Sequence, residues 1–521
     1  MKSLSYLLHN SFLKYKKYPA IKINEKIITY EELNNRALVF ARLLIDKKGS
    51  NNVVGIITQR NYSTYIGVLA SVYSGFTYVP INSKYPIDKI NRIIKEANIQ
   101  MLIADDIEWN DVKSNFEHNE NIAYVLFPSY DTQHVVEKGP ITFFNLNSID
   151  ALKQPIESRY DNNIYIMFTS GSTGNPKGVQ VSNKNILSLL NNMNNYYELE
   201  PGFRSSQTFD LSFDLSISDI FFTWMKGGTI CVLSNEELFC PSDYINREKI
   251  NFWHSVPTLA VFMNKLGFLE ENMYPSLQYS IFCGEPLTQT IANKWGLAAP
   301  NSTVENLYGP TEATVFITRY SYSNHNTDYM PKNGIVQIGK PFNDQRIMLV
   351  DSNEEPINNG EIGEIILSGD QVAKGYLDPE KTIKVFKKMK WDELGEIWYK
   401  TGDLAFVNDY GDIEFLERKD KQIKIGGRRV EIGEIESIIR KFNKFEDTII
   451  VPYRDNNNIV QYLIGFVTRS LNTDDILEIR EKCSSKLEDI FFPKNFIYIK
   501  EIPTIVSGKV DRRKLEELIP N

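Results

Sequence analysis

The chain has 521 residues, 42% hydrophobic and 24% charged, a balance typical of folded globular proteins rather than disordered ones. Its formal net charge of -8 argues against a nucleic-acid-binding protein. The four cysteines are scattered without a Cys-x-x-Cys pair, which argues against a zinc site or a disulfide framework.

The N-terminal part has the pattern of an α/β protein. Residues 1–19 lack the continuous apolar stretch and cleavage site of a signal peptide and predict an amphipathic helix. No stretch of about 18 apolar residues occurs, so we expect no membrane insertion and a cytoplasmic location. Strands are predicted at 53–57, 77–80 and 101–104, and helices at 65–73 and 89–97. This alternation implies a parallel sheet, whereas the polar, Asn-rich residues 105–163 predict surface strands and loops.

A buried strand predicted at 164–168 is followed by the segment Thr169-Ser-Gly-Ser-Thr-Gly-Asn-Pro-Lys-Gly178. Glycines let backbone N–H groups face an anion, hydroxyls add neutral donors, and Lys177 adds a positive charge, so the segment suits a triphosphate. It is not a Walker A loop, because Pro176 and Gly178 stand where that motif has Gly and Ser or Thr. A flexible linker is disfavoured, because linkers rarely follow a buried strand and end in Pro-Lys-Gly.

The predicted secondary-structure pattern changes twice in the remainder of the chain. Strands and helices alternate again over 184–318. From 335 to 416, short strands separated by turn residues predict a β-rich subdomain, with strands at 346–350 and 363–367. A basic segment at 418–429 and a helix predicted at 434–441 then begin a compact α+β unit of about 100 residues.

Three further motifs supply chemistry that an ATP-binding enzyme needs. Asn306-Leu-Tyr-Gly-Pro-Thr-Glu312 combines an aromatic ring that can stack on adenine with a carboxylate that can hold Mg²⁺. Tyr399-Lys-Thr-Gly-Asp-Leu404 places Asp403 in a tight turn, where it can accept hydrogen bonds from ribose hydroxyls. Ser507-Gly-Lys509 predicts an exposed loop near the C-terminus. Each motif alone is weak, and their joint occurrence in this order carries the argument.

Together these motifs resemble the adenylate-forming superfamily, which includes adenylation domains of peptide synthetases, acyl-CoA synthetases and firefly luciferase. The matching segments cover nearly the whole chain, from Ile28-Thr-Tyr-Glu-Glu-Leu33 to Lys509. Within the superfamily the chain is most similar to the D-alanine:D-alanyl carrier protein ligases. That similarity rests on 171–180, on Phe213-Asp-Leu-Ser216 with Asp219, on Phe282-Cys-Gly-Glu285 and on 308–315.

The resemblance implies a domain organisation. We expect an α/β fold with a large N-terminal domain, residues 1–417, made of two αβ-layered sheet subdomains and the β-rich subdomain. A hinge at 418–420, containing Asp420, would join it to a small mobile α+β domain at 421–521. In the family this small domain rotates between two reactions, and the rotation would bring Gly426 and Gly427 to the thiol channel.

The resemblance also implies the reaction. A carboxylate attacks the α-phosphate of ATP to give an acyl-adenylate and pyrophosphate, and a thiol then takes the acyl group. Lys509, Glu312 and Thr173 correspond to the catalytic residues, and Glu312 to the Mg²⁺ ligand. A solvated surface lysine is the alternative for Lys509. The nucleotide-binding residues are predicted to be Thr169, Ser170, Gly171, Ser172, Thr173, Gly174, Lys177, Asn306, Tyr308, Gly309, Thr311, Asp403, Arg418 and Lys509.

Asp214 determines the predicted substrate class. In amino-acid-activating members the matching aspartate pairs with the substrate ammonium group, although an aspartate here can also cap a helix starting near Ser216. The predicted substrate-binding residues are Asp214, Leu215, Ser218, His254, Ile281, Cys283, Gly284, Leu307, Val315 and Phe316. His254 and Phe316 are larger than this branch of the family leads us to expect, and His254 is either a pocket residue or a packed histidine.

The predicted function is therefore a stand-alone, monomeric ligase that activates a small amino acid, D-alanine-like or alanine, serine or glycine, with ATP and Mg²⁺. No carrier-type serine motif occurs, so the acceptor is expected to be the phosphopantetheine of a carrier protein acting in trans, or coenzyme A. The basic segment 418–429 either docks that carrier or binds ATP, or is a solvated charged hairpin; this stays open for Lys419, Lys421 and Arg428. An acyl-CoA synthetase is the alternative function, and a catalytically silent adenylate-binding protein is disfavoured because Lys509 and Glu312 are present.

Overall fold

The computed structural model describes residues 2–105, 109, 113–116, 119–128, 149–170, 176–323, 331, 334–419, 422–442, 448–455, 459–504 and 510–519. The chain divides into two compact units. The first comprises Met1–Ser83, Ile93–Phe168 and Gly178–Glu417, and the second Lys84–Arg92, Thr169–Lys177 and Arg418–Asn521. The hinge at 418–420 stays a prediction, since Asp420 lies outside the described residues.

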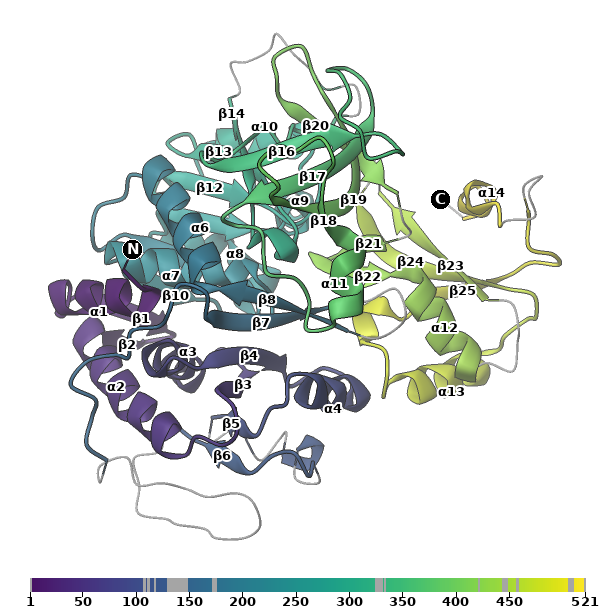
Figure 1. Cartoon of the computed structure of the whole chain (residues 1–521). Helices are drawn as coiled ribbons and strands as arrows, with labels where there is room; N and C mark the ends of the chain where they lie inside the picture. Colours follow the sequence, from purple (N-terminus) through teal and green to yellow (C-terminus); the bar gives the residue numbers. More distant parts are fainter. Residues whose placement is uncertain are drawn as a thin grey trace. The chain divides into compact units, whose positions relative to one another are not determined.

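A six-stranded sheet contains the first predicted strands (Figure 1). Its order is β6 (Tyr124–Leu126), β5 (Met101–Ile103), β3 (Val53–Thr58), β4 (Thr77–Asn82), β7 (Asn163–Thr169) and β8 (Lys177–Ser182). The pairs of β3 with β4 and β5, of β5 with β6, and of β4 with β7 are parallel, as the alternating pattern predicted. The predicted helices are present as α3 (Tyr62–Ser74) and α4 (Ile87–Glu96).

A nine-stranded sheet forms the centre of the first unit. Its order is β15 (Lys340–Pro341), β14 (Thr318–Tyr322), β13 (Thr303–Tyr308), β12 (Tyr279–Phe282), β11 (Phe252–Ser255), β9 (Arg204–Gln207), β10 (Thr229–Val232), β1 (Pro19–Ile23) and β2 (Lys26–Thr29). The strands from β1 to β13 in this order are parallel, while β2, β14 and β15 pair antiparallel at the two edges.

Helices cover both faces of this sheet, as a buried parallel sheet requires. They are α1 (Leu4–Lys14), α2 (Tyr30–Asp46), α6 (Asn183–Tyr196), α7 (Leu215–Lys226), α8 (Pro241–Arg247), α9 (Pro257–Lys265) and α10 (Gln289–Ala298). On one face, Phe222 of α7 packs against Phe252 of β11 with ring centroids 5.6 Å apart. On the other, Trp253 stacks on Trp295 of α10 at 5.8 Å. Successive residues of β11 therefore point to opposite helical layers.

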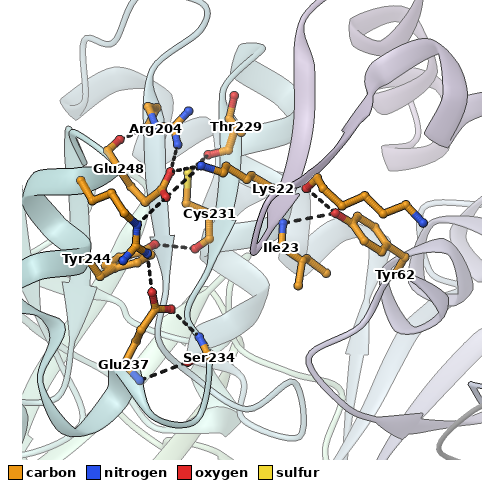
Figure 2. Close-up of polar contacts among 12 residues, drawn as sticks. Lys22, Ile23, Tyr62, Arg204, Thr229, Cys231, Ser234, Glu237, Tyr244 and Glu248 are labelled. Carbon is orange, nitrogen blue, oxygen red and sulfur yellow. Dashed lines mark hydrogen bonds and ion pairs between the residues drawn. The ribbon is translucent and has the colours of Figure 1, made fainter.

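A polar cluster ties β1, β9 and β10 to α8 (Figure 2). Glu248, 5% exposed, accepts a hydrogen bond of 2.9 Å from Lys22 and pairs with Arg204 and Arg247. Burial alone would raise the pKa of Glu248, but hydrogen bonds from Lys22 and Arg247 and the charge of Arg204 lower it. The cluster is a satisfied structural network, because each charge in it faces an opposite one.

The β-rich subdomain is a five-stranded sheet in the first unit. Its path is β16 (Gln345–Val350), β17 (Gly363–Gly369), β19 (Ile397–Val407) and β18 (Phe386–Lys388), with β20 (Ile413–Arg418) also paired to β19, and α11 spans Pro379–Val385. Val350, Ile366, Met389 and Trp398 form a separate small core beneath it.

Glu354, in a turn of this subdomain, gives a stability prediction. Hydrogen bonds from Lys387 (2.8 Å) and Lys400 (2.6 Å) lower the pKa of Glu354 to about 2. Since the folded pKa is depressed, the stabilisation is present above the unfolded value of about 4.3 and is lost as the pH falls through about 2. After allowance for solvent screening, we expect Glu354→Gln to lower the free energy of unfolding by about 1 kcal/mol at pH 7.

Thermal melts of both proteins check this expectation. The melting temperature of Glu354→Gln should lie about 1–2 °C below that of the wild type at every pH from 6 to 8, and the gap should shrink in 1 M NaCl because salt screens the pairs. Equal melting temperatures at low salt would show that the two lysines do not stabilise the fold through this carboxylate.

The second unit contains the predicted C-terminal elements. A hairpin joins β21 (Gln422–Ile425) to β22 (Arg428–Glu431), and a three-stranded sheet contains β23 (Thr448–Arg454), β24 (Val460–Val467) and β25 (Asn495–Tyr498). The helices are α12 (Ile432–Phe442), α13 (Thr473–Cys483) and α14 (Arg512–Glu516). Two apolar clusters form its core, one around Ile435 and Leu463 and one around Val451 and Leu515.

The predicted fold class is confirmed: both halves of the chain are mixed α/β, with the β-rich subdomain between them in sequence. None of the four cysteines, all of which lie in the described part of the chain, forms a disulfide bond. Within the described part of the chain, none of the helices combines the length and apolarity needed to cross a bilayer.

Candidate active site

The predicted substrate residues gather where β11, β12 and β13 end and α7 begins, the edge at which α/β sheets bind ligands. His254 and Ile281 are opposite one another in the β11–β12 register, and Leu307 lies two residues beyond the partner of Ile281 on β13. They therefore share one face of the sheet. Six predicted pocket residues are buried: Leu215, Ile281, Cys283, Leu307, Val315 and Phe316.

Gly284 and Ser218 complete this region. Gly284 has φ +95°, a backbone conformation that glycine adopts without strain. A Cβ at this position would lie 3.5 Å from Leu215 Cδ1, so the turn after β12 packs directly onto the start of α7. Ser218 is buried and its hydroxyl donates to the Leu215 carbonyl at 2.7 Å, which leaves the hydroxyl held by its own helix.

Asp214 immediately precedes α7 and is partly buried. In the described helix its side chain makes no capping hydrogen bond, and its backbone is helical (φ −64°, ψ −24°) rather than extended as in a typical N-cap. The alternative that Asp214 serves as a helix cap is therefore wrong. Burial, with the nearby charge of Asp214, raises the pKa of Tyr165 well above its usual range. The carboxylate thus lies close enough to the buried Tyr165 to affect its pKa.

His254 is 1% exposed and forms a pair with Asp219 of α7. The distance from His254 Nδ1 to Asp219 Oδ1 is 2.7 Å. Burial raises the pKa of Asp219 to about 6, against the opposing effect of His254. The rings of Phe209 and Phe316 lie 4.8 and 6.1 Å from the imidazole, both edge-on. His254 is thus buried among the predicted pocket residues and held by a carboxylate.

The end of β13 and the loop after it carry four of the predicted nucleotide residues, Asn306, Tyr308, Gly309 and Thr311. Asn306 donates to the carbonyls of Val336 (2.9 Å) and Gln337 (3.0 Å), so its amide group fixes the end of β13; its predicted contact with nucleotide is not tested. Gly309 passes so close to the returning chain that a Cβ would lie 2.4 Å from Phe316 Cα. Only glycine fits there without displacing the backbone.

Two residues of the same loop, next to the predicted pocket, have a strained backbone conformation. Thr314 and Val315 have φ of +55° and +75°, which are uncommon for β-branched residues and cost about 1–3 kcal/mol each. Gln371 holds this conformation from both sides: its carbonyl accepts from Thr314 Oγ1 at 2.6 Å, and its side chain donates to the Phe316 carbonyl at 2.7 Å. The strained turn is thus fixed by the segment that follows β17.

Glu312 is a buried carboxylate with a defined orientation. It is 1% exposed, and its Oε1 accepts a hydrogen bond of 2.7 Å from the Tyr376 hydroxyl. Its backbone carbonyl accepts from the Ala373 amide at 2.8 Å. Thr311, partly buried, begins the same short 3₁₀ turn as Glu312. The predicted metal ligand is therefore positioned by the segment 371–376 as well as by its own loop.

Asp403 is joined to the same loop by a second tyrosine. The Tyr308 hydroxyl donates to Asp403 Oδ2 at 2.5 Å, and Asp403 is 5% exposed. The tight turn predicted here is wrong: residues 397–407 form one strand, β19, with a β-bulge opposite Glu364, where Gly402 has φ +76° and its amide donates to Glu364 Oε1 at 3.1 Å. The predicted adenine-side aromatic and the predicted ribose ligand are thus in direct contact.

Several predicted residues lie in the second unit. Thr169, Ser170 and Lys177 are partly buried, and Ser170 Oγ donates to the Arg429 carbonyl at 2.6 Å. Arg418 ends β20 and is partly buried. Gly426 and Gly427 have φ of +56° and +76° and form the two-residue turn of the β21–β22 hairpin. Arg428 pairs with Glu488, so its charge already has a partner within this unit.

Five predicted site residues lie outside the described residues: Gly171, Ser172, Thr173, Gly174 and Lys509; the hinge residue Asp420 does as well. Conversely, Tyr376, Gln371 and the Asp219–His254 pairing were not assigned roles from the sequence. Tyr376 stands in a segment that matched the family, Gly375-Tyr-Leu377, and this match was the only signal that pointed to it.

The chain is similar to known proteins over most of its length. Residues 8–377 match the family described as AMP-binding enzyme. The D-alanine–D-alanyl carrier protein ligase of Listeria monocytogenes is 30% identical over 514 residues, which covers 96% of this chain and 95% of that protein. Malpinin synthetase of Mortierella alpina is 30% identical over 516 residues, but the chain spans only 6% of its length.

A solved structure is similar over the full length. The adenylation domain AlmE of Vibrio cholerae, in complex with glycyl-adenosine-5′-phosphate, matches with a TM-score of 0.87 and 26% identity. The match covers 99% of this chain and 98% of that one.

Proposed function

The chain belongs to the AMP-binding enzyme family and is an AMP-forming ligase, and from this premise we propose that it activates a small amino acid as the aminoacyl-adenylate and transfers the aminoacyl group to a phosphopantetheine thiol. The acceptor in this proposal is a carrier protein acting in trans. Support comes from the carrier protein ligase that the chain matches over nearly its whole length, and from the glycyl-adenylate in the similar solved structure.

One observation carries the proposal: the 2.5 Å hydrogen bond between Tyr308 and Asp403. It links an aromatic ring suited to adenine with a carboxylate suited to ribose hydroxyls, and Glu312 lies in the loop that directly follows Tyr308. An adenosine unit bound by these two residues would have its phosphates on the side of Glu312. Asp214 supports an amino acid as the second substrate, because a partly buried carboxylate is stabilised by a substrate ammonium group.

In the first step, an oxygen of the substrate carboxylate forms a bond to the α-phosphorus of ATP and the bond to pyrophosphate breaks. The carboxylate and the phosphate oxygens repel one another, so positive charge and positioning dominate catalysis. We assign Lys509 to that charge, between the carboxylate and the α-phosphate, and Lys177 and the hydroxyls of 169–173 to the pyrophosphate. In the second step, the thiolate sulfur attacks the acyl carbon, AMP leaves, and the thiol proton passes to solvent.

Glu312 fits a magnesium ion. Among the residues described, no group of three His, Cys, Asp or Glu side chains could hold a metal by itself. This agrees with Mg²⁺, which typically binds one or two carboxylates together with substrate phosphates and water. Bound there, the ion would neutralise phosphate charge, and Tyr376 would keep the Glu312 carboxylate turned toward it.

Replacing Tyr376 with phenylalanine tests this role. The change removes the 2.7 Å hydrogen bond to Glu312 Oε1 and keeps the ring. We expect the Mg²⁺ concentration for half-maximal activity to rise about 10-fold, the usual effect of losing a group that orients a metal ligand. Titration of Mg²⁺ in an ATP–pyrophosphate exchange assay measures it. A melting temperature close to that of the wild type, with an unchanged Mg²⁺ requirement, would remove Tyr376 from this role.

Amino-acid-dependent ATP–pyrophosphate exchange tests the proposed function itself. A panel of the twenty L-amino acids and several D-amino acids should give exchange with one or a few small members, and the panel also decides chirality. An acyl-CoA synthetase of a small carboxylic acid, the second candidate, would instead give exchange with acetate or propionate and no preference for the ammonium group. Exchange with no amino acid would overturn the proposal.

A further inference from the structure

A buried polar group lies on the pocket face of the nine-stranded sheet, beneath α7. Its centre is the pair of His254 and Asp219, 1% and 0% exposed at their side chains, with Nδ1 and Oδ1 2.7 Å apart. The backbone of His254 is fixed on both sides: its amide donates to Ser206 Oγ at 3.0 Å, and its carbonyl accepts from Thr208 Oγ1 at 2.6 Å. The imidazole therefore has a set position and a set orientation.

The strand register adds a glutamine to this group. Phe252 of β11 pairs with Ser205 of β9. Gln207 is level with His254, because each lies two residues further along its strand, and their backbones are separated by one strand spacing of about 4.8 Å. Gln207 is fully buried, and its Oε1 accepts from the Tyr65 hydroxyl at 3.3 Å.

Three buried atoms of this group have no hydrogen-bond partner among the described residues: His254 Nε2, Asp219 Oδ2 and Gln207 Nε2. An unsatisfied buried polar atom costs about 1–3 kcal/mol, so such atoms normally meet a ligand or an ordered water. The ring of Phe316, a predicted pocket residue, lies 6.1 Å from the imidazole. The imidazole of His254 is thus next to a residue of the predicted substrate side-chain pocket.

Asp219 sets the hydrogen-bonding character of His254. A carboxylate facing Nδ1 accepts a hydrogen bond, which assigns a proton to Nδ1 and leaves Nε2 as the imidazole nitrogen that can hydrogen-bond a ligand. Gln207 Nε2 is a donor. A hydroxyl group is a donor and an acceptor at once, so it can pair with either kind of atom, whereas a methyl group or a hydrogen atom can pair with neither.

We propose that His254, positioned by Asp219, is a specificity-determining residue that hydrogen-bonds the substrate side chain, and that the preferred substrate is a small amino acid bearing a side-chain hydroxyl, serine or a close analogue, rather than alanine or glycine. The inference rests on the proposed function and narrows its substrate class. Phe209 and Phe316 flank the imidazole and restrict the volume around it, which disfavours long side chains.

The test is ATP–pyrophosphate exchange with D- and L-serine, D- and L-alanine and glycine. For the wild type, kcat/KM for one serine enantiomer should exceed that for the matching alanine by about 10–100-fold, because alanine leaves the buried polar atoms unpaired. His254→Phe keeps a flat ring against Phe209 and Phe316 and removes Nε2. It should lower kcat/KM for serine by about the same factor and change that for alanine by less than about 3-fold.

Asp219→Asn tests the positioning role separately. The amide keeps the shape of the side chain but no longer dictates which imidazole nitrogen carries the proton. The serine-to-alanine ratio should fall part of the way toward that of His254→Phe, with KM for ATP unchanged. Ser280→Ala is the matched control: it removes a buried 2.7 Å hydrogen bond to Ser302 from the opposite face of the same sheet and should lower the melting temperature without changing the ratio.

Each failure has a distinct meaning. Exchange with alanine or glycine but not with serine overturns the hydroxyl inference and leaves the proposed function intact. A serine-to-alanine ratio unchanged in both His254→Phe and Asp219→Asn makes His254 a packed histidine that bonds a structural water. Absence of exchange with every amino acid overturns the proposed function itself. If His254→Phe does not fold, the serine-to-alanine ratio of kcat/KM measured for Asp219→Asn tests the proposal: an unchanged ratio overturns it.

Discussion

Replacement of Lys509 by alanine is expected to lower the rate of amino-acid-dependent ATP–pyrophosphate exchange by about 10²–10³-fold, the range found when one preorganised electrostatic group is removed from an active site. The physical reason is the approach of two anions: the substrate carboxylate must reach an α-phosphorus surrounded by negative oxygens. A cation between them stabilises the charge that builds up in the transition state. The effect should appear in kcat more than in KM for ATP, because the remaining nucleotide residues still bind the ground state.

Two further measurements make the result specific. ATP binding, followed by calorimetry, should change by less than about 3-fold in Lys509→Ala. Thioester formation from a pre-formed aminoacyl-adenylate should stay near the wild-type rate, because the second reaction displaces AMP and does not bring two anions together. Lys514→Ala is the matched control, an exposed lysine of α14 five residues further along. Full exchange activity in Lys509→Ala would assign the reacting charge to another residue.

Asp214→Ala is expected to have the second largest effect. Removing one partner of a desolvated charge pair costs about 2–5 kcal/mol, so kcat/KM for the amino acid should fall by about 10²-fold or more. The position supports an effect of this size: Asp214 is partly buried and directly precedes α7, and it makes no capping hydrogen bond whose loss would destabilise the helix. The melting temperature should therefore change little.

The same variant separates the two candidate functions. If Asp214 binds the substrate ammonium group, the loss should be large for the amino acid and absent for propionate, which lacks that group. Asp243→Ala, an exposed aspartate in the first turn of α8, is the control for a loss of negative charge near a helix start. Equal losses for amino acid and propionate would indicate a structural role for Asp214 and favour the acyl-CoA synthetase.

The fold was predictable because its strands and helices differ in local pattern. The apolar run 164–168 appears as β7, and the amphipathic segment 434–441 lies within α12. These features depend on neighbouring residues, and a sequence displays them directly. The two-residue Gly426-Gly427 turn is of the same kind, since adjacent glycines allow the positive φ angles that a tight hairpin needs.

The partners within the site were not predictable from the sequence alone. Tyr376 is 64 residues from Glu312, and Asp219 is 35 residues from His254. Nothing in either local pattern indicates these pairs, because they form only when separate elements pack. The left-handed backbone of Thr314 and Val315 could not be predicted for a related reason. β-branched residues favour an extended backbone, and the hydrogen bonds with Gln371 override that preference.

One feature of the first unit bears on how such enzymes can be re-engineered. Tyr308 ends β13 and Glu312 lies in the loop after it, yet each is bonded to the β-rich subdomain, through Asp403 and Tyr376 respectively. A chimaera that exchanges residues 207–320 to import a different amino-acid preference would cut across both bonds. Donor and recipient would have to preserve both tyrosine–carboxylate hydrogen bonds. Otherwise the chimaera could have a correct amino-acid pocket but a nucleotide loop that has lost its contacts with the β-rich subdomain.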